Sequence, residues 1–578
     1  MYQHVISKIK IFIFINVAVF AMASTGFCQD YIVSPDISYG NGTGTLDSPY
    51  SLRKANEVAI AGDTIYLRVG TYGSEYKDHV CPENDGSEGK YITYMPYNNE
   101  SVTIQSTYGS DSHGVDITGK SYIKVDGLIF DGCTGSGVWT GSRTESGTGA
   151  DYCIIQNCSF KNIDDAYTVI YIGNGSSYNK VLNNVIDGGM FNGNSMDGIT
   201  IGGNRDDETL GAQYNLVEGN EIYSVGHSCC NISGSKTHHN IVRNNFFHSA
   251  RKRVDSIGDV PNLMATGALT YRNVIENNRL YYPYSNSLQF RCKDHIVRRN
   301  IFYKSNEEVS GSGDAAAILF SATSSRPDTI NNKIYNNTTY YRQTSGGASW
   351  FGIKMSLYDS SANLDNNVIK NNIIFGADVD SSSEYPIYFS RSVSRSITDS
   401  FDSNVISKKS LNYDGIRYFL GGRGNTYYTL SEAKADPEFA GVFLASNMET
   451  DPMLEAPENL DFRLKADSPL IDAGTNLTKV ISDSGNARSF KVEDAGYFLD
   501  GWGIVDGDSI RIGNSTGTIE SIDYDTNMIT LSKEISWEKG ETVNLTYNGS
   551  GPDIGAFEFG LESSNDLLPP QDLQVVLE

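Results

Sequence analysis

Five short segments between residues 164 and 291 carry the side chains best suited to acid–base chemistry on an acidic substrate. Aspartate oxygens are hard ligands of the kind that Ca²⁺ prefers. An imidazole or a lysine amine can remove a proton from carbon, and a guanidinium pairs with a carboxylate. The candidates are Asp164, Asp165 and Asp197 as metal ligands, His227 and Lys252 as bases, and Arg251 and Arg291 as partners of a substrate carboxylate.

Each of these residues also has a purely structural explanation. Asp164 and Asp165 suit a turn, because aspartate bonds to nearby backbone there. His227 follows Gly226 at the end of a loop, where its ring could bond to backbone alone. The basic run at 251–253 is typical of a solvated loop. A functional interpretation therefore depends on elements that bring these segments together.

A recurring unit in the middle of the chain indicates a β-solenoid. The pattern apolar-x-x-Asn-x-apolar appears as VLNNVI, VEGNEI, VRNNFF and further copies, and Cys158 starts the column. The residues around each asparagine alternate with the strand period of two, and no segment among them keeps the 3.6-residue period of a helix. Fixed units joined by loops of variable length are typical of solenoids. The repeated asparagines are Asn184, Asn220, Asn245, Asn278, Asn300, Asn337, Asn372 and Asn404.

Asparagine suits the repeated position for a physical reason. It tolerates a left-handed turn, and its amide both donates and accepts hydrogen bonds, so stacked copies can bond to one another. Successive coils of a parallel solenoid lie roughly 4.8 Å apart. The ionisable segments then fall on consecutive coils, which predicts that the carboxylates, the imidazole and the basic loop converge on one substrate residue.

The remaining segments predict a cap, an insertion and a tail. Residues 51–60 form an amphipathic helix suited to covering the open first coil. The runs SIRIG, TGTIESIDY, NMITLS and ETVNLTY predict a small β-barrel that packs beside or over the last coil. The expected organisation is a signal peptide at 1–28, a β-helix at 29–477, an inserted β domain at 478–551, a closing segment at 552–560 and a tail at 561–578.

The N-terminus and the overall charge restrict location and partners. Lys8 and Lys10 precede an apolar run and then small residues, as in a cleavable signal peptide, so we expect a secreted, periplasmic or cell-surface protein. No later stretch approaches the twenty apolar residues of a membrane span. The formal net charge of −25 excludes a general nucleic-acid binder. A capped solenoid needs no partner subunit for stability, so we expect a monomer.

Three blocks of sequence occur in the order of a known architecture. They are GNGTGTLDSPYSLRKANEVAIAGDTIYLRVGTYG, the asparagine repeat, and DFRLKADSPLIDAG with PDIGAFEFG. Together they resemble secreted proteins of the pectate lyase-like superfamily of right-handed parallel β-helices. The resemblance implies an all-β fold with three strands per coil, one of which lines a substrate groove. The outward residues of that strand are then Tyr171, Thr200, Asn231, Gln289, Leu319 and Lys354.

The resemblance also implies an activity on polysaccharides. Superfamily lyases cleave glycans that contain uronic acid by β-elimination, often with Ca²⁺, and the candidates above supply a cation and a base. The metal-mediated version is favoured, because the net charge of the chain repels an acidic glycan.

Two other functions stay open. The segments NSMDGITI, GHS and RCK resemble motifs of polygalacturonase-type β-helix hydrolases, although the pair of aspartates that those enzymes use is missing. Alternatively, the protein is a non-catalytic solenoid that binds glycans on outward aromatic rings such as Tyr171, Tyr281, Tyr282 and Tyr284.

Overall fold

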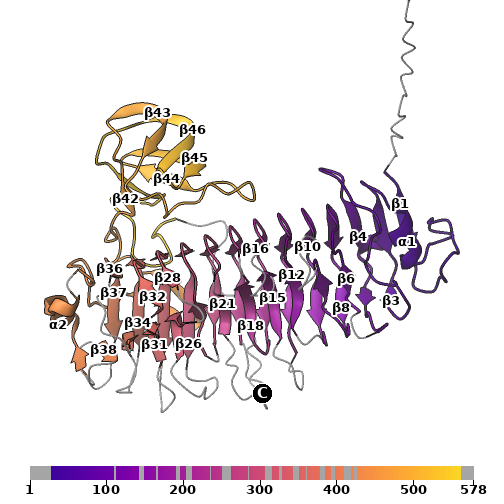
Figure 1. Cartoon of the computed structure of the whole chain (residues 1–578), viewed down its shortest axis with the longest axis horizontal. Coiled ribbons are helices and arrows are strands. Elements are labelled where there is room, and N and C mark those ends of the chain that lie inside the picture. Colours follow the sequence, from indigo (N-terminus) through magenta and orange to yellow (C-terminus); the bar gives the residue numbers. More distant parts are fainter. Residues whose placement is uncertain are drawn as a thin grey trace, which may run out of the picture.

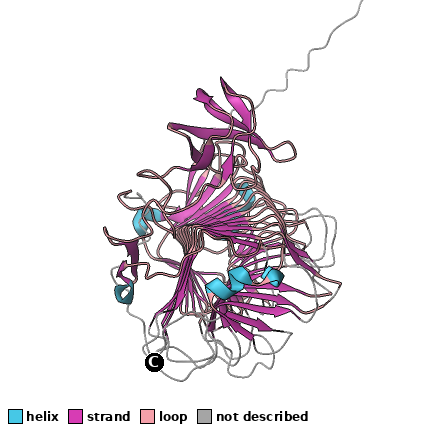
Figure 2. Ribbon diagram, turned by 90° about the vertical axis from the view of Figure 1, so that its left-hand side faces the viewer, coloured by secondary structure: helices cyan, strands magenta, loops and turns pink. Residues whose placement is uncertain are grey.

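The chain folds into an elongated solenoid that carries a smaller β domain on one side (Figure 1). The computed structural model describes residues 28–561, with gaps at 110–111, 142–148, 165–166, 190–195, 203–210, 235, 250–261, 268, 284, 306–314, 325–327, 343–349, 360, 378–384, 392–397, 409–417, 422–425 and 440. The predicted signal peptide, apart from its last residue, and nearly all of the predicted tail lie outside the described residues. The view along the long axis shows three walls of stacked strands around a core (Figure 2).

Sheet I is parallel throughout and has 13 strands. Its inward residues follow one register from coil to coil, as in Ile155, Val181 and Val217, because the apolar positions alternate at the strand period. The strands are β1 (Asp30–Val33), β2 (Thr64–Leu67), β4 (Ile92–Pro96), β7 (Ile123–Asp126), β10 (Ile154–Gln156), β13 (Lys180–Leu182), β16 (Leu216–Glu218), β19 (Ile241–Arg243), β22 (Val274–Glu276), β25 (Ile296–Arg298), β29 (Lys333–Tyr335), β33 (Val368–Lys370) and β36 (Ser400–Asp402).

Sheet II has 12 strands and meets sheet I at the corner that holds the repeated asparagines. Phe130 and Phe160 stack inside it with ring centroids 4.7 Å apart. The strands are β3 (Gly70–Tyr72), β5 (Val102–Ile104), β8 (Ile129–Asp131), β11 (Ser159–Lys161), β14 (Val185–Asp187), β17 (Glu221–Tyr223), β20 (Phe246–His248), β23 (Arg279–Tyr281), β26 (Ile301–Ser305), β30 (Thr338–Arg342), β34 (Ile373–Ala377) and β37 (Val405–Lys408).

Sheet III also has 12 strands, and the long variable loops of the coils lead into it. It is parallel except for its last strand, which pairs antiparallel. The strands are β6 (Val115–Asp116), β9 (Val138–Trp139), β12 (Thr168–Ile172), β15 (Asp197–Gly202), β18 (Ser228–Ser233), β21 (Asn262–Thr266), β24 (Leu288–Phe290), β27 (Ala315–Ala322), β31 (Trp350–Leu357), β35 (Tyr385–Arg391), β38 (Tyr418–Gly421) and β39 (Thr426–Tyr428).

The asparagine column is confirmed as a continuous hydrogen-bonded ladder. Each side-chain oxygen accepts from the backbone N–H and the amide of the preceding copy, as Asn300 does from Asn278 at 2.9 and 3.0 Å. The ladder extends one coil beyond the predicted set, to Asn447. One detail of the prediction is wrong, since the left-handed residue is the one before the ladder position, such as Asn183 with φ of 53° before Asn184.

A second ladder runs beside the first and was not predicted. Asn179, Asn215 and Asn240 bond to one another with the same geometry, five residues before their partners in the first ladder. Each pair of ladder residues therefore frames one short strand of sheet I. The constant spacing of five was the sequence signal for this ladder, and it continues through Asn273, His295, Asn332, Asn367 and Asp399.

Removing one ladder amide is expected to destabilise the solenoid strongly. The Asn300 amide donates to the Ile275 and Arg298 carbonyls and to Asn337 Oδ1, at 2.9 to 3.0 Å. An N300A variant removes these three donated bonds, and the buried Asn278 N–H and amide lose Asn300 Oδ1 as their acceptor, so we expect a loss of about 2–4 kcal/mol in the free energy of unfolding. Urea titration checks this, with exposed Asn486→Ala as the control, for which we expect a change below about 0.5 kcal/mol.

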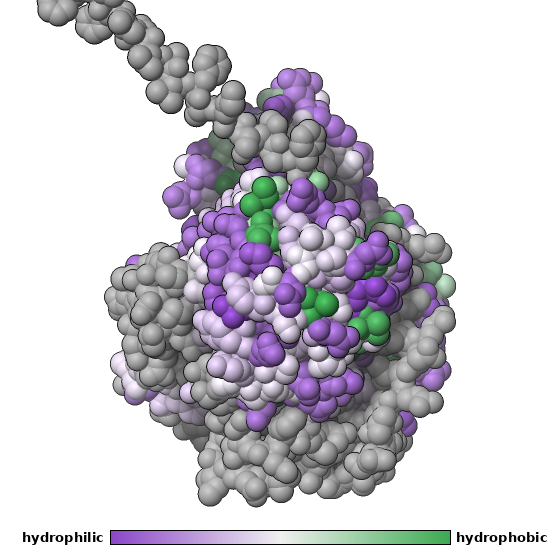
Figure 3. Space-filling view, turned by 90° about the vertical axis from the view of Figure 1, so that its right-hand side faces the viewer, coloured by the Kyte–Doolittle hydropathy of each residue, from purple (hydrophilic) through white to green (hydrophobic). Residues whose placement is uncertain are grey.

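Helices cover both ends of the solenoid. The helix α1 (Leu52–Val58) lies at the first coil, where the Ser51 hydroxyl caps it by accepting from the Lys54 N–H, and it buries Leu52 and Ala55. The surface at this end is largely hydrophilic, with isolated apolar patches (Figure 3). At the other end α2 (Leu430–Ala435) begins with a capping box between Thr429 and Glu432. Single 3₁₀ turns occupy η1 (Tyr97–Asn99), η2 (Pro437–Phe439) and η3 (Pro457–Asn459).

The insertion forms a curled antiparallel sheet, as predicted, but its position differs from the prediction. It packs on the outer side of sheet I against middle coils, from Leu216 to Val368, rather than on the last coil. Apolar residues on that side of sheet I, including Val274 and Tyr335, form one cluster with Phe498 of the insertion. Its strands are β42 (Thr478–Lys479), β43 (Gly485–Lys491), β44 (Ser509–Ile512), β45 (Ser515–Asp523), β46 (Met528–Trp537) and β47 (Thr542–Leu545).

Two short pairs complete the strands, namely β28 (Asp328–Ile330) with β32 (Asn363–Asp365), and β40 (Leu454–Ala456) with β41 (Asp461–Leu464). Tyr281, expected among the outward aromatic platforms, is fully buried, and its ring packs against Phe462 of β41. Tyr282 is partly buried in the same cluster, and Tyr284 lies outside the described residues. Within the described part of the chain, no helix is long and apolar enough to cross a membrane.

Glu558 in the closing segment at 552–560 is expected to make the free energy of unfolding depend on pH. Burial and the nearby Asp553 carboxylate raise the pKa of Glu558 from 4.5 to about 8. Because the folded state binds this proton more tightly than the unfolded state, stability falls as pH rises from about 4.5 to about 8. Glu558→Gln is therefore expected to raise the free energy of unfolding by about 1–3 kcal/mol at pH 8.5, after discounting for partial exposure.

At pH 4 the same substitution is expected to change stability little, because Glu558 is then protonated in both states. Thermal melts at the two pH values test this, with exposed Glu493→Gln as the control. An equal gain at both pH values would contradict the assignment.

Candidate functional site

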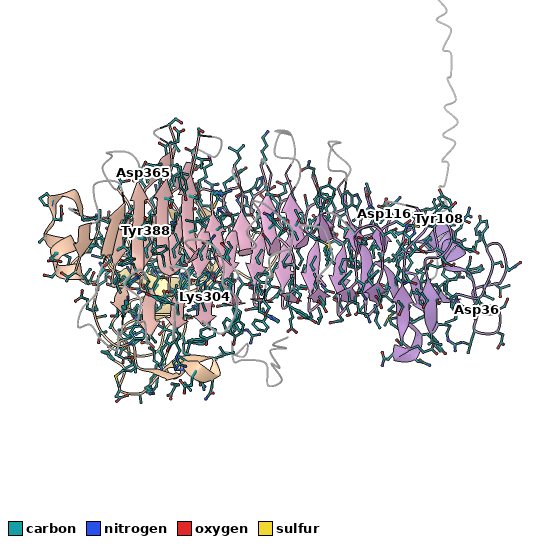
Figure 4. All side chains as sticks on the ribbon, turned by 90° about the horizontal axis from the view of Figure 1, so that it is seen from below. Asp36, Tyr108, Asp116, Lys304, Asp365 and Tyr388 are labelled. Atoms are coloured by element: carbon teal, nitrogen blue, oxygen red, sulfur yellow. The ribbon has the colours of Figure 1, made fainter. Side chains whose placement is uncertain are left out.

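The outer face of sheet III presents one residue per coil in a single line, which we call the outer column. Its neighbours in each strand, such as Ile170 and Ile172, point into the core, so the column faces outward. The predicted strip occupies this line. The column runs from Asp116 through Trp139, Tyr171, Thr200, Asn231, Gln289, Leu319 and Lys354 to Tyr388, and β21 crosses the line between Asn231 and Gln289. Its two end residues lie near opposite ends of the solenoid (Figure 4).

An aspartate–histidine pair lies at the centre of this face. Asp197 begins β15 and His227 directly precedes β18, so adjacent coils bring them together. Asp197 Oδ1 lies 2.6 Å from His227 Nδ1. The other carboxylate oxygen accepts from Asn231 Nδ2 at 2.9 Å and from Thr200 Oγ1 at 3.0 Å. Thr200 and Asn231 of the outer column therefore orient the Asp197 carboxylate, and this carboxylate orients the His227 imidazole.

This network fixes the orientation and the tautomer of the imidazole. A carboxylate only accepts hydrogen bonds, so the proton between the two groups belongs to His227 Nδ1. In the neutral ring the lone pair is then on Nε2. The His227 side chain is 34% exposed while that of Asp197 is 9% exposed, so the ring is accessible and its partner is sheltered. A histidine oriented in this way by an aspartate can act as a general base.

Aromatic rings continue the face on the N-terminal side of the pair. His113 and Trp139 stack with centroids 4.7 Å apart at an interplanar angle of 3°. Trp139 in turn lies 4.4 Å from Tyr171. Sequence reasoning missed Trp139, although it occupies the same alternating position as Tyr171 one coil earlier. Tyr171 itself is only 2% exposed, so the accessible part of the stack is Trp139 and His113 rather than the predicted tyrosine.

The C-terminal part of the outer column is more apolar than we expected from the sequence. Lys354 is 7% exposed, and its ammonium lies 5.3 Å from the ring centroids of both Phe351 and Tyr388. Leu319 packs with Phe351 and Tyr385 in a small cluster on the same face. Lys354 lies four strands beyond Asn231, roughly 19 Å along the face. It cannot act on the same sugar unit as His227, and Gln289 lies between them.

The other predicted candidates divide into placed and unplaced residues. Arg291 directly follows β24, and its Nε is buried without a hydrogen bond among the described residues. Asp164 lies in an exposed turn, where its N–H donates to the Cys133 carbonyl. Asp165, Arg251 and Lys252 lie outside the described residues.

The described residues do not form the calcium site that we expected from the sequence. There, no group of three or more histidine, cysteine or acidic side chains is placed to hold a metal ion. Asp197, one of the three expected ligands, already accepts hydrogen bonds from His227, Asn231 and Thr200. The described donors therefore do not fit Ca²⁺ at this position.

Comparison with known proteins supplies no family for the chain as a whole. No family model matches it. The uncharacterized protein YwoF of Bacillus subtilis (strain 168) is 40% identical over 77 residues, and the match spans 13% of this chain and 15% of that protein.

The chain is similar to several solved structures at low sequence identity and low TM-score. Pectate lyase Pel9A has a TM-score of 0.38 at 16% identity over 92% of this chain and 96% of that chain. A rhamnogalacturonan lyase has a TM-score of 0.38 at 17% identity over 65% of this chain and 87% of that chain. The GH136 lacto-N-biosidase from Eubacterium ramulus has a TM-score of 0.42 at 12% identity over 65% of this chain and 67% of that chain. The three sheets of stacked parallel strands and the ladder identify the fold of this chain as a parallel β-helix.

Proposed function

We propose that this protein is an exported, monomeric carbohydrate-active enzyme, a polysaccharide lyase that cleaves a glycan containing uronic acid by β-elimination. The observation that carries the proposal is the Asp197–His227 pair on the outer face of sheet III, next to the Trp139 stack. A polymer that lies along this face would meet an oriented base and, three strands or roughly 14 Å away, an accessible aromatic ring. The predicted signal peptide at 1–28 supports export.

The chemistry requires a base at one ring carbon and a cation at the substrate carboxylate. His227 Nε2 takes the proton from the carbon that bears the carboxylate, the neighbouring carbon–oxygen bond breaks, and a carbon–carbon double bond forms. The leaving oxygen takes a proton from water and becomes the hydroxyl of the new reducing end. Arg291 is the described candidate for the cation, because β24 lies two strands from β18, roughly 10 Å away. Arg251 is a further candidate.

Hydrolysis by two carboxylates has less support from the geometry. Inverting and retaining enzymes need two carboxyl groups roughly 5 to 9.5 Å apart. The carboxylates nearest to each other on the described outer face of sheet III are Asp197 and Asp116, whose strands are three spacings, roughly 14 Å, apart. Elimination needs one base and one cation instead of two carboxylates, and the structure orients a base, so elimination is preferred.

A substrate panel tests the proposal directly. The mature protein is incubated with pectin, alginate, glycosaminoglycans, ulvan and neutral glycans, with and without EDTA, while ultraviolet absorbance and reducing ends are recorded. We expect both signals to rise together on an acidic glycan, since elimination creates a conjugated double bond. Reducing ends without absorbance would replace the lyase by a hydrolase. If neither absorbance nor reducing ends increase although the protein is folded, the result would favour a non-catalytic solenoid that binds glycans.

The effect of EDTA shows whether an arginine or a metal ion neutralises the substrate carboxylate. Activity that survives EDTA is expected if an arginine neutralises the carboxylate. Activity that disappears with EDTA and returns with Ca²⁺ would restore the metal-mediated version, with ligands from the segment around Asp164 and Asp165.

A further inference from the structure

A cleft of about 530 Å³ lies where the inserted β domain meets sheet I, away from the outer column of sheet III. One wall consists of corner residues from successive coils, and the other comes from loops of the insertion. The corner residues occupy the left-handed position before each strand of sheet I, as Arg272 does with φ of 50°. The residues that matter below are Arg272, Asp294, Asn331 and Lys333 on the solenoid, and Trp502 and Tyr524 on the insertion.

The charges that line this cleft leave one cation without a carboxylate. Lys333 pairs with Asp494 at 2.6 Å, and the Asp294 carboxylate accepts from the Asn331 amide at 3.2 Å. The Arg272 guanidinium instead lies 5.5 Å from the centroid of the Tyr524 ring and makes no ion pair with any residue that the structure describes. A guanidinium over an aromatic ring keeps its N–H groups available for a planar anion.

The neighbouring histidines do not compete for such an anion. Burial, together with His238 and Arg272, lowers the pKa of His239 to about 3. Burial and Arg272 also lower the pKa of His238. Both imidazoles are therefore neutral near pH 7, and Arg272 is the cation of the cleft that has no ion pair with a described residue.

A long aromatic stack holds one wall of the cleft in place. Tyr152, Tyr178 and Tyr214 stack with centroids 4.9 and 5.1 Å apart, and Tyr214 continues to His239 at 5.1 Å. Trp502 of the insertion meets His239 edge to face at 4.6 Å. Within the stack each ring covers the face of the next, so these tyrosines stabilise the corner rather than offer platforms to a ligand. The stack does fix Trp502 at the cleft before any ligand arrives.

We propose that this cleft is a second carbohydrate-binding site, which takes an acidic sugar unit whose anionic group pairs with Arg272. Aromatic rings, carboxamides and one cation are the groups that recognise the faces, the hydroxyls and the acid of such a sugar. The Trp502 and Tyr524 rings and the Asn331, Asn366 and Asn527 amides line the same space. The ligand class agrees with the proposed function, but binding here requires no catalysis on sheet III. A polymer held at both places would bind more tightly than at either one.

Calorimetric titration of the full chain tests the second site. Titrations use the His227→Ala variant, which prevents turnover, with oligogalacturonate and oligoalginate as carboxylate probes, a sulfated oligosaccharide, and a neutral cello-oligosaccharide. We expect two molecules of an acidic probe per chain, and one after Trp139→Ala on sheet III. In that Trp139→Ala background, Arg272→Gln is expected to weaken the remaining site by about 10- to 100-fold, because a charge-assisted pair is lost. The sulfated probe shows whether the site requires a carboxylate or any anion.

Arg488→Ala is the matched control. Arg488 lies on β43 of the same domain and pairs with Glu520 outside the cleft, so its loss is expected to leave binding unchanged. Thermal melts identify any variant that fails to fold, and Trp502→Phe supplies a second, milder change in the cleft. Equal affinity of the Arg272→Gln variant and its parent would overturn the second site. Loss of activity on every glycan together with binding that depends on Arg272 would instead overturn only the proposed reaction.

Discussion

Replacing His227 by alanine is expected to lower the turnover of an acidic glycan by about 10²- to 10⁴-fold, which is the usual contribution of a positioned general base. The structure gives the reason, since the imidazole is the accessible member of a pair whose other member is sheltered by Thr200 and Asn231. The initial rate of absorbance increase on the substrate found in the panel measures the effect. The KM is expected to change much less than kcat, because the base acts only once the sugar is bound.

The control for this prediction is His248→Ala. His248 lies on sheet II, where it pairs with Glu221 at 3.2 Å, away from the outer column. We expect its turnover to stay within about twofold of the parent, as for substitutions away from the reacting groups. Asp197→Asn is expected to lower kcat as well, because the amide no longer selects the tautomer with the Nδ1 proton. Full activity of the His227→Ala variant would show that His227 is not the base, and Lys252 would then be the candidate to test.

Replacing Arg298 by methionine is expected to cost about 3–5 kcal/mol of folding free energy at pH 7, the largest stability effect that we predict. Arg298 is 3% exposed and bridges two carboxylates, Glu276 on sheet I at 2.6 Å and Asp508 of the insertion at 2.7 Å. Its guanidinium also donates to the Tyr335 hydroxyl at 3.1 Å. Without the guanidinium, two sheltered carboxylates face each other, and Glu276 keeps only the longer ion pair with Arg243 at 3.9 Å.

The pH dependence separates this explanation from a simple loss of packing. Burial alone would raise the pKa of Glu276, but Arg298 overcomes that effect and lowers it. The parent is therefore stabilised by this group above the ordinary pKa of a glutamate and loses that stability as pH falls through the lowered value. In the variant the carboxylates can take up protons, so its deficit is expected to shrink between pH 7 and pH 4.

Urea titrations at both pH values measure this deficit. Arg463→Ala serves as the control, because Arg463 is 50% exposed and pairs with Asp461 at the surface, where an ion pair contributes at most about 1 kcal/mol. A deficit of the Arg298→Met variant that is equal at both pH values would indicate lost packing instead of an uncompensated charge.

Several features of this molecule follow from local patterns in the chain. The ladder from Asn184 to Asn404 was predictable, because an asparagine recurs beside strands with a period of two, and each coil repeats the same short-range solution. The register of Thr200, Asn231 and Gln289 follows from the same alternation, since a slip of one residue would place apolar side chains outside. The second ladder was equally visible in its spacing of five residues and was overlooked.

The pairing of distant residues required the tertiary structure. Asp197 and His227 were both named from the sequence, but as a metal ligand and a base, and only the stacking of β15 on β18 shows that one orients the other. Trp139 was missed because its strand, β9, has two residues and breaks the repeat pattern. Charge type and spacing along the chain carry no information about which side chains point at each other across coils.

The sequence by itself determined the solenoid, its asparagine column, its N-terminal cap and the β character of the insertion, because each of these depends on contacts within a strand or between neighbouring coils. The tertiary structure alone decided where the insertion docks and what it creates there. Arg298 and Asp508 are 210 residues apart, and nothing local to either residue specifies their contact. Docking depends on the shape and charge of two finished surfaces, which exist only after both parts have folded.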